Sequence, residues 1–345
     1  METTILDVAR AVGVSQTTVS RALSGTGRVS EQTRRAIIRA AVDLNYRHVR
    51  AEDRAAALPG QTIAVIVPDL GNPFLPEILK GITQAADAGG HLVVVSGSGR
   101  NRARGWSNLA GVRRKGVSGA VIVESTITGE QLQAATSGIP VVIFDRDYSL
   151  PGASMIRADQ HGGAVQATEH LLHLGHTEIV HLRGPLDQPV ATARAAGYEQ
   201  RIVTAGLEPR VVNSDWSEQA GYESTLALLA EGRPFTAVFA ASDPNAYGVL
   251  AALDEHHVVV PDDVSVVGFD DLQMSSFTHP RLTTIRQDGI RLGAAAAMIL
   301  LRQWEQGRIV PVQETIPVDL IVRSSTAPPR KTPAGSVAGS AAEVG

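Results

Sequence analysis

Four polar residues near the N-terminus have the types and the spacing that can read DNA bases. Gln16, Thr17, Ser20 and Arg21 fall at positions i, i+1, i+4 and i+5, so on a helix they share one face. Arginine can form two hydrogen bonds with guanine, glutamine can do the same with adenine, and a polar helix face without carboxylates fits the major groove. The pattern predicts a DNA-reading helix. The alternative is the solvated face of an ordinary helical hairpin.

Two helices and a tight turn would position this face. Thr4 is a suitable N-cap for a first helix, and Gly13 supplies the bend after it. Ser15 is a suitable N-cap for the second helix, and Ser30 for a third helix that follows. The turn, the caps and the carboxylate-free face coincide, which indicates a helix-turn-helix headpiece.

Composition and charge place the DNA-binding potential at one end of the chain. The 345 residues suit two or three domains, with 43% hydrophobic and 19% charged residues and no cysteine. Residues 1–60 contain nine arginines and six carboxylates, whereas the whole chain has a net charge of −4. A cationic head on an acidic body confines the attraction for phosphates to the head. No apolar run suggests a membrane span or a signal peptide, so we expect a cytoplasmic protein.

Short apolar strands alternate with helices beyond a linker. The expected strands are 63–67, 92–95, 121–123, 141–144, 179–182, 210–213, 237–239 and 265–269, and the expected helices are 77–88, 129–136, 162–174, 192–205, 217–230 and 244–256. Fully apolar strands between helices imply parallel sheets covered on both faces, and their number exceeds one compact sheet. We therefore predict a headpiece over 1–46, a hinge or linker over 47–61, a two-lobed α/β core over 62–325 and a disordered tail over 326–345.

Several strings, in this order, resemble the lactose-repressor (LacI/GalR) family of bacterial transcription regulators. They include TILDVARAVGVSQTTVSRAL, IAVIVPDLGNPF, ARAAGYEQ, VPDDVSVVGFDD and LTTIRQD, and the similarity extends over about residues 3–326. The resemblance implies an all-α helix-turn-helix headpiece and an α/β two-lobed core with parallel sheets, similar to periplasmic sugar-binding proteins. It also implies a homodimer on a pseudo-palindromic double-stranded DNA operator, with a small-molecule effector between the lobes that changes operator affinity.

The resemblance also assigns roles within the headpiece. It places Gln16, Thr17 and Arg21 at base edges, and it leaves Arg28 open between a base and a phosphate contact. Hydroxyl groups and helix N-termini suit phosphates. The resemblance places Ser15, Ser20, Ser30 and Thr33 at phosphates, and Thr4 is a further DNA-contact candidate.

The hinge departs from the family pattern. The family commonly has a leucine nine residues after a tyrosine, as a wedge in the minor groove, but Ala55 stands at that distance from Tyr46. Leu58 is the nearest leucine, and two acidic residues (52 and 53) add negative charge close by. Either Leu58 replaces the wedge through a shifted register, or the protein bends DNA less. Drift in a flexible linker is the third interpretation.

Side chains that follow the strands of the core are the candidates for effector binding, since ligands of open α/β sheets bind beyond the carboxyl ends of the strands. Aromatic faces can stack on a sugar, and carboxylate and guanidinium groups can hold its hydroxyls. We therefore expect a carbohydrate, a mono- or disaccharide, with plain core packing as the alternative role for each aromatic residue. The candidates that follow strands are Asp69, Asn72, Phe74, Asp145, Arg146, Trp216, Asp243 and Asp270, and Arg194 opens a second-lobe helix. The family resemblance places six of these residues around the ligand: Phe74, Arg146, Arg194, Trp216, Asp243 and Asp270.

Other chemistry has weaker support in the sequence. His170 and His173 share a helix face at i, i+3 but have no carboxylate at a suitable spacing, so we expect no metal. We also expect no cofactor and no catalytic residues, because nothing activates a nucleophile and no phosphate-binding loop occurs. Two alternatives remain open: a sugar-binding protein of the transport class, or a sugar-modifying enzyme with a DNA-binding head that uses Asp145 and Asp243 as acid and base.

Overall fold

A computed structural model of the protein describes residues 4–24, 29–44, 61–67, 70–97, 117–123, 138–145 and 152–330. The chain divides into two compact units, Met1–Gly60 and Gln61–Gly345, which we call the headpiece and the core. Within the described residues, no helix is long and apolar enough to cross a membrane.

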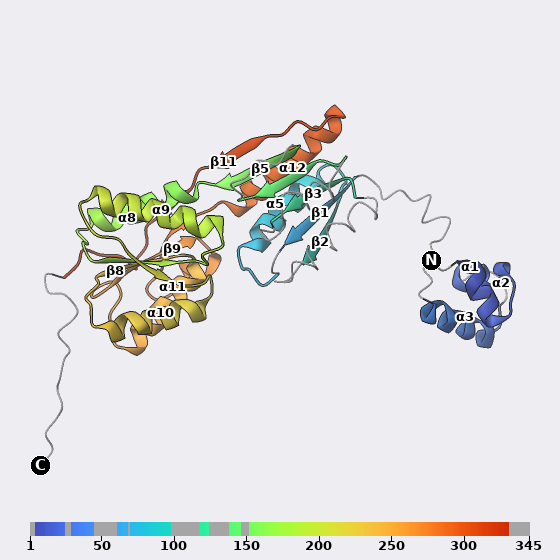
Figure 1. Ribbon diagram of the computed structural model, residues 1–345, viewed down its shortest axis with the longest axis horizontal. Helices are drawn as coiled ribbons and strands as arrows, with labels where there is room; N and C mark the ends of the chain where they lie inside the picture. Colours follow the sequence, from blue (N-terminus) through green and yellow to red (C-terminus); the bar gives the residue numbers. More distant parts are fainter. Residues whose placement is uncertain are drawn as a thin grey trace, which may run out of the picture. The chain divides into compact units, whose positions relative to one another are not determined.

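The headpiece is a small helical unit (Figure 1) made of α1 (Ile5–Val12), α2 (Gln16–Ser24) and α3 (Glu31–Asp43). Both the amide and the hydroxyl of Thr4 donate to Asp7 Oδ2, at 2.8 and 2.6 Å, which fixes the start of α1. Gly13 ends α1 with φ at 71°, a left-handed conformation that costs glycine little. Val8, Val19 and Ile37, one from each helix, are fully buried against one another. The predicted cap and turn are confirmed.

The first lobe of the core is a parallel sheet in the order β11-β5-β4-β3-β1-β2. Its central strands are runs of buried apolar residues, as expected of a sheet covered on both faces. Helices α5 (Leu75–Asp87) and α12 (Gly289–Gln306) pack against each other and against this sheet. The strands are β1 (Thr62–Val67), β2 (Leu92–Gly97), β3 (Gly119–Ile122), β4 (Val141–Phe144), β5 (Ala153–Ala158) and β11 (Gln313–Ile316).

The second lobe is a sheet in the order β12-β10-β9-β8-β6-β7, in which only β12 is antiparallel to its neighbour. Helices α8 and α9 lie on one side of it and α10 and α11 on the other (Figure 1). Its elements are α8 (Gln160–His173), β6 (Ile179–Arg183), α9 (Pro189–Thr204), β7 (Arg210–Asn213), α10 (Glu218–Glu231), β8 (Ala237–Ala240), α11 (Asp243–Glu255), β9 (Ser265–Asp270), the 3-10 helix η1 (Gln273–Ser276), β10 (Thr283–Arg286) and β12 (Asp319–Ile321).

Three short segments connect the lobes within the described core: residue 159 between β5 and α8, residues 287–288 between β10 and α12, and residues 317–318 between β11 and β12. Two of these crossovers end in a helix cap. Asp159 Oδ1 accepts from the Gly162 amide and Asp288 Oδ1 accepts from the Arg291 amide, both at 2.9 Å. These caps fix the first turns of α8 and α12 where the chain changes lobe.

The structure adds elements that the sequence did not predict, chiefly β5, β10, α12, β11 and β12. Helix α12 is rich in glycine and alanine because it approaches α5 closely. A Cβ atom at Gly81 would lie 2.0 Å from the Ile290 carbonyl oxygen, and one at Gly293 would lie 2.0 Å from the Ile78 carbonyl oxygen.

The boundary predicted for the tail at residue 326 is wrong by five residues. Thr326 Oγ1 lies 2.9 Å from His170 Nε2, and the Ala327 carbonyl oxygen lies 2.9 Å from His176 Nε2. Arg330 pairs at 2.7 Å with each of two carboxylates, those of Asp262 and Asp263. The second lobe therefore holds the chain as far as Arg330. The tail beyond it, residues 47–60 of the hinge predicted over 47–61, and the helix predicted over 129–136 lie outside the described residues.

Candidate functional site

The outer face of α2 carries the side chains predicted to read bases. Gln16, Thr17 and Arg21 are exposed, whereas Val19 and Ala22 on the opposite side are buried in the headpiece. Ser20 is half-buried at the edge of this face. The local geometry therefore matches the helix face predicted from the spacing, with its amide, hydroxyl and guanidinium groups presented together.

The serines predicted as helix caps occupy those positions. Ser15 Oγ accepts from the Thr18 amide at 3.1 Å, and Ser30 Oγ accepts from the Thr33 amide at 3.2 Å. The hydroxyls of Ser30 and Thr33 also lie 2.7 Å apart. Ser15 and Ser30 thus mark the N-termini of α2 and α3, which are the positive ends of these helices and suit phosphates. The remaining DNA-contact candidates, Arg28, Ala55 and Leu58, lie outside the described residues.

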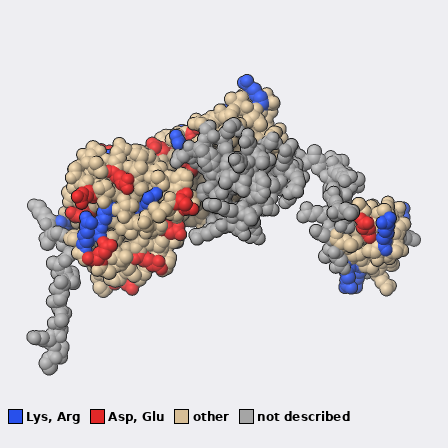
Figure 2. Space-filling model, viewed as in Figure 1, with Lys and Arg blue, Asp and Glu red and all other residues tan. Residues whose placement is uncertain are grey.

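Charge is distributed as the composition indicates. In Figure 2, the described surface of the headpiece shows more blue Lys and Arg than red Asp and Glu, while red groups are scattered over the second lobe. The described surface of the headpiece therefore has the sign of charge that DNA phosphates attract.

Arg194 is the centre of the candidate effector site. It lies on α9, and only 3% of it is exposed. Its Nε donates to Gln160 Oε1 at 2.9 Å, one terminal nitrogen donates to the Ala241 carbonyl, and the other lies 3.5 Å from Asp270 Oδ1. The guanidinium carbon lies 3.7 Å from the centre of the Phe269 ring, a cation–π contact that helps to hold a buried charge.

Two glutamines join Arg194 to groups from both lobes. Gln160 Nε2 donates to Gln287 Oε1 at 2.8 Å and to Asp145 Oδ1 at 3.3 Å. Gln287 Nε2 in turn donates to Asp270 Oδ1 at 2.6 Å. We call these five residues the crossover network, because Gln160 directly follows one crossover and Gln287 lies in another. It connects Asp145 at the end of β4 in the first lobe with Asp270 at the end of β9 in the second.

Burial dominates the electrostatics of the network. Desolvation raises the pKa of Asp145 to about 6, against the opposing effects of the Gln160 hydrogen bond and the Arg194 charge. Desolvation also raises the pKa of Asp270, although Arg194 and Gln287 favour its charged form. Burial lowers the pKa of Arg194, and the nearby carboxylates oppose this. A polar ligand that supplies hydrogen bonds here would meet groups that water no longer solvates.

Asp243 occupies a different place from the one predicted. It is fully buried, and its two oxygens accept from the Leu272 amide at 2.8 Å and from the hydroxyls of Ser275 and Thr284, both at 2.5 Å. Its carboxylate therefore ties the start of α11 to η1 and β10. An effector contact at Asp243 is not supported by this geometry, because the protein already surrounds the side chain.

The Trp216 ring is held at the second-lobe side of the network, 5.3 Å from the Arg194 guanidinium. A Cβ atom at Gly184 would lie 2.6 Å from the ring, so only glycine leaves room for it there. The backbone around the ring is also fixed: Ser242 Oγ donates to the Trp216 carbonyl at 3.0 Å, and Asn245 Nδ2 donates to the Asp215 carbonyl at 3.0 Å. Trp216 is half-buried, so part of its surface remains accessible.

Phe74 stands at the start of α5, where its amide donates to Asn72 Oδ1 at 2.9 Å. A Cβ atom at Gly289 would lie 3.2 Å from its ring, so Phe74 lies beside the start of α12, two residues from Gln287. Asn72 is exposed. The other first-lobe candidates, Asp69 and Arg146, lie outside the described residues.

Sequence reasoning missed Gln160, Gln287, Phe269 and Asn245. Gln287 directly follows β10 (Thr283–Arg286), and this position after a strand is the signal that could have identified it. His170, one of the two histidines considered for a metal, makes a hydrogen bond to the C-terminal segment, and so does the nearby His176. Among the described residues, no cluster of three His, Asp or Glu side chains has a metal-binding arrangement.

Comparison with known proteins agrees with both parts of the structure. Residues 4–48 match the family described as bacterial regulatory proteins, lacI family, and residues 168–326 match a periplasmic binding protein-like domain. The chain is 31% identical over 324 residues to the ribose operon repressor of Halalkalibacterium halodurans, covering 94% of this chain and 97% of that protein.

Solved structures show the same similarity. The lac repressor dimer bound to operator and an anti-inducer has a TM-score of 0.72 and 32% identity, covering 95% of this chain and 100% of that chain. A LacI-family regulator from Enterococcus faecium with bound ribose also has a TM-score of 0.72, at 29% identity, covering 78% of this chain and 99% of that chain. With a helix-turn-helix headpiece, a two-lobed core and this similarity over nearly its whole length, the chain belongs to the lacI family of bacterial transcription regulators.

Proposed function

We propose that this DNA-binding transcription regulator is a repressor, and that a carbohydrate bound between the lobes of its core controls its operator affinity. The crossover network is the observation that carries this proposal. Its hydrogen bonds connect Asp145 of the first lobe to Arg194 and Asp270 of the second through Gln160 and Gln287. A ligand that competes for these groups changes the preferred relation between the lobes.

The chemistry of the network favours a polyhydroxylated ligand. One guanidinium, two carboxylates and two amides offer donors and acceptors close together, and Trp216 and Phe74 add aromatic surface. This combination suits a sugar, with hydroxyls held by charged groups and C–H faces placed on rings. The regulator from Enterococcus faecium contains ribose, and another structural relative, CelR, contains cellobiose.

A homodimer on a pseudo-palindromic operator completes the proposal. Strand β2 lies at the edge of the described first-lobe sheet and exposes Leu92, Val94 and Val95 by 44%, 45% and 39%. Exposed apolar side chains on an edge strand suit a second copy of the chain. The lac repressor is a dimer on its operator, and two headpieces would place their α2 faces in successive major grooves.

We propose no catalytic role. The alternative of a sugar-modifying enzyme needs Asp145 and Asp243 as an acid and base pair. The three hydrogen bonds to Asp243 all come from the protein, so this carboxylate is engaged in holding the fold. The named relatives are repressors and other regulators of transcription.

Two linked measurements test the proposal. Selection of bound sequences from random DNA identifies the operator, and operator affinity is then measured with a panel of mono- and disaccharides. We expect a half-site sequence in two copies, and at least one sugar that changes affinity and perturbs tryptophan fluorescence. Trp216→Phe should remove most of that fluorescence change and Trp304→Phe should not. A protein that binds its operator but responds to no carbohydrate contradicts the proposed effector class.

A further inference from the structure

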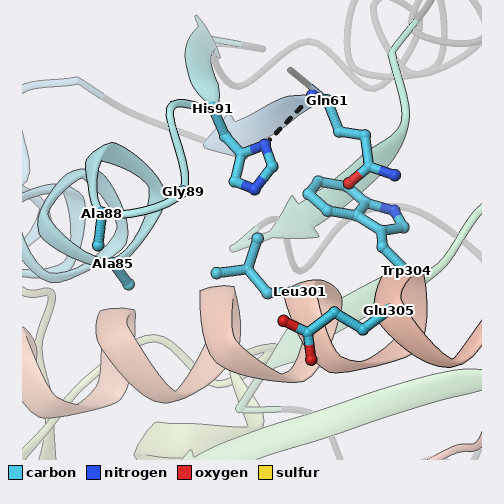
Figure 3. A pocket seen from close by; sticks show the side chains of 8 residues that line it. All are labelled: Gln61, Ala85, Ala88, Gly89, His91, Leu301, Trp304 and Glu305. Atoms are coloured by element: carbon cyan, nitrogen blue, oxygen red, sulfur yellow. Dashed lines mark hydrogen bonds between the residues drawn. The ribbon is translucent and has the colours of Figure 1, made fainter.

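A second concave site lies in the first lobe, away from the crossover network. Figure 3 shows a pocket of about 410 Å³ between the C-terminal ends of α5 and α12, close to the first strand of the core. Its walls are two aromatic rings, a carboxylate, an amide and small apolar side chains. The lining residues are Gln61, Ala85, Ala88, Gly89, His91, Leu301, Trp304 and Glu305.

The packing of the two helices explains why a pocket opens here. Near their N-terminal halves, Gly81 and Gly293 bring α5 and α12 into backbone-to-backbone contact, and Gly289 meets the Phe74 side chain, with no room for a Cβ atom at any of the three. Toward the other end, Ala85 and Ala88 face the space opposite Leu301 (Figure 3). Small residues on α5 cannot fill the gap, so it remains a cavity.

The aromatic walls are held by hydrogen bonds that leave their faces available. The backbone N–H of Gln61 donates to His91 Nδ1 at 3.1 Å, and Trp304 Nε1 donates to the backbone carbonyl of Ser118 at 3.0 Å. The two rings meet edge to face with centroids 5.4 Å apart. A Cβ atom at Gly89 would lie 2.5 Å from the His91 ring, so glycine is needed for the ring to sit there. The walls are preformed.

The charge of the pocket indicates its ligand. Glu305 is exposed at the rim and makes no hydrogen bond or ion pair within the described residues, and the lining includes no lysine or arginine. An indole face beside a carboxylate attracts cations, and the apolar side chains accept a flat hydrocarbon body. We propose that this pocket is a second small-molecule site that takes small organic cations with a flat apolar body.

The position of the site gives it access to the elements of the crossover network. Helix α12 begins two residues after Gln287 and extends for 18 residues before it ends beside the pocket. Helix α5 begins beside Phe74 and also ends there. A ligand that separates the C-terminal ends of α5 and α12 therefore acts on two helices whose other ends adjoin Phe74 and Gln287. By linkage, such a ligand and the effector would change each other's affinity equally.

Benzamidine is a suitable probe, because it joins a phenyl ring to an amidinium cation. The full-length protein is labelled with 5-fluorotryptophan, and fluorine NMR follows its three tryptophans. The Trp304→Phe variant assigns the Trp304 resonance. We expect benzamidine to shift that resonance saturably, with a dissociation constant on the order of 1 mM for a ligand of this size, and to leave the Trp216 resonance in place.

Two comparisons distinguish charge-dependent binding in this pocket from non-specific binding. Glu305→Gln removes the carboxylate at constant size and should weaken benzamidine about fivefold, whereas Glu314→Gln, at an exposed carboxylate on β11, should change nothing. Neutral benzamide should bind the unmodified protein about fivefold more weakly than benzamidine does. The proposal is overturned if the Trp304 resonance shows no saturable shift, if benzamide binds as tightly as benzamidine, or if Glu314→Gln weakens binding as much as Glu305→Gln does.

Discussion

Asp243 is where the sequence and the structure disagree most clearly, and its substitution by alanine gives a sharp prediction. The family resemblance places this residue around the effector, whereas the structure surrounds it with three donors from η1 and β10. If Asp243 contacts the effector, Asp243→Ala removes the ligand response and leaves stability nearly unchanged. If its hydrogen bonds instead stabilise the second lobe, which we call the frame role, the main effect is on the free energy of unfolding.

The magnitude follows from the donors that lose their acceptor. The Leu272 amide and the Thr284 hydroxyl are buried, and an unsatisfied buried donor costs about 1–3 kcal/mol. Ser275 loses less, because its hydroxyl also lies 2.8 Å from the Tyr247 hydroxyl. Removing the desolvated carboxylate returns part of this cost. We therefore expect Asp243→Ala to lower the free energy of unfolding by about 3 kcal/mol.

Asp243→Asn is the matched variant. It keeps the volume that Gly268 accommodates, since a Cβ atom at Gly268 would lie 2.4 Å from Asp243 Oδ1. An amide can still accept from the Leu272 amide and can donate to Thr284, so the cost should be about 1 kcal/mol. Burial and the charge of Asp270 raise the pKa of Asp243 in the folded protein. The stability linked to this group is present at low pH and is lost as pH rises, so the cost of Asp243→Asn should shrink with rising pH.

The assay is urea denaturation followed by circular dichroism, at one fixed protein concentration because the protein is proposed to dimerise. Operator binding at low temperature serves as a check that each variant is folded. A destabilisation of Asp243→Ala below about 1 kcal/mol would refute the frame role, since even one orphaned donor costs that much. An equal effect of Asp243→Asn and Asp243→Ala would refute the assignment of individual hydrogen bonds.

Four further predictions test other parts of the molecule. Arg21→Ala should cost about 1–3 kcal/mol at one operator position and relax its base preference, and an unchanged selected sequence profile would contradict a base contact. Asp270→Asn should weaken the effector by on the order of 100-fold through the loss of the Arg194 pair, with ligand-free operator binding retained in the same titration. Burial lowers the pKa of His181 to about 4 from 6.5, so the protein should lose up to about 3 kcal/mol of stability as pH falls from 6.5 to 4, and the non-titrating His181→Asn variant should show a flatter urea-midpoint profile. Gly81→Ala should destabilise the core by about 3 kcal/mol or more in calorimetry, and a neutral result would mean that α5 and α12 do not meet as closely as described.

The parts that the sequence predicts well are those in which local pattern and burial coincide. Strand β1 is a run of six buried residues, and Thr4, Gly13 and Ser15 have the cap and turn roles that their types indicate. Helix α12 was missed although it is the longest in the described residues, because its first half is shaped by contact with α5. Glycine and alanine lie there because the two helices approach closely, and the sequence reasoning did not recognise this run of small residues as a helix.

The candidate site shows the same division. Arg194 and Asp270 were both candidates for the effector site, and their side chains lie 3.5 Å apart. Their role in effector binding stays a prediction. Gln160 was not expected, because it follows β5, a strand that the sequence did not predict. Asp243 was expected in the cleft because it follows β8. The direction in which a side chain leaves a turn is set by its hydrogen-bond partners, here on η1 and β10, and these are distant in sequence.

The placement of the crossover network explains how a weak polar ligand could act on the whole core. Gln160 and Gln287 are each within two residues of a helix cap, at Asp159 and Asp288, so a hydrogen bond gained or lost at either glutamine bears directly on the first turn of α8 or α12. The crossovers beside them are one and two residues long and cannot absorb much displacement. A sugar that replaces the Gln160 bond to Asp145 would therefore favour one arrangement of the lobes over another. The free energy of that shift can be no larger than the difference in the sugar's binding free energy between the two arrangements. Experiments should therefore vary the residues of the network, because they set this difference, and not only the total affinity for the sugar.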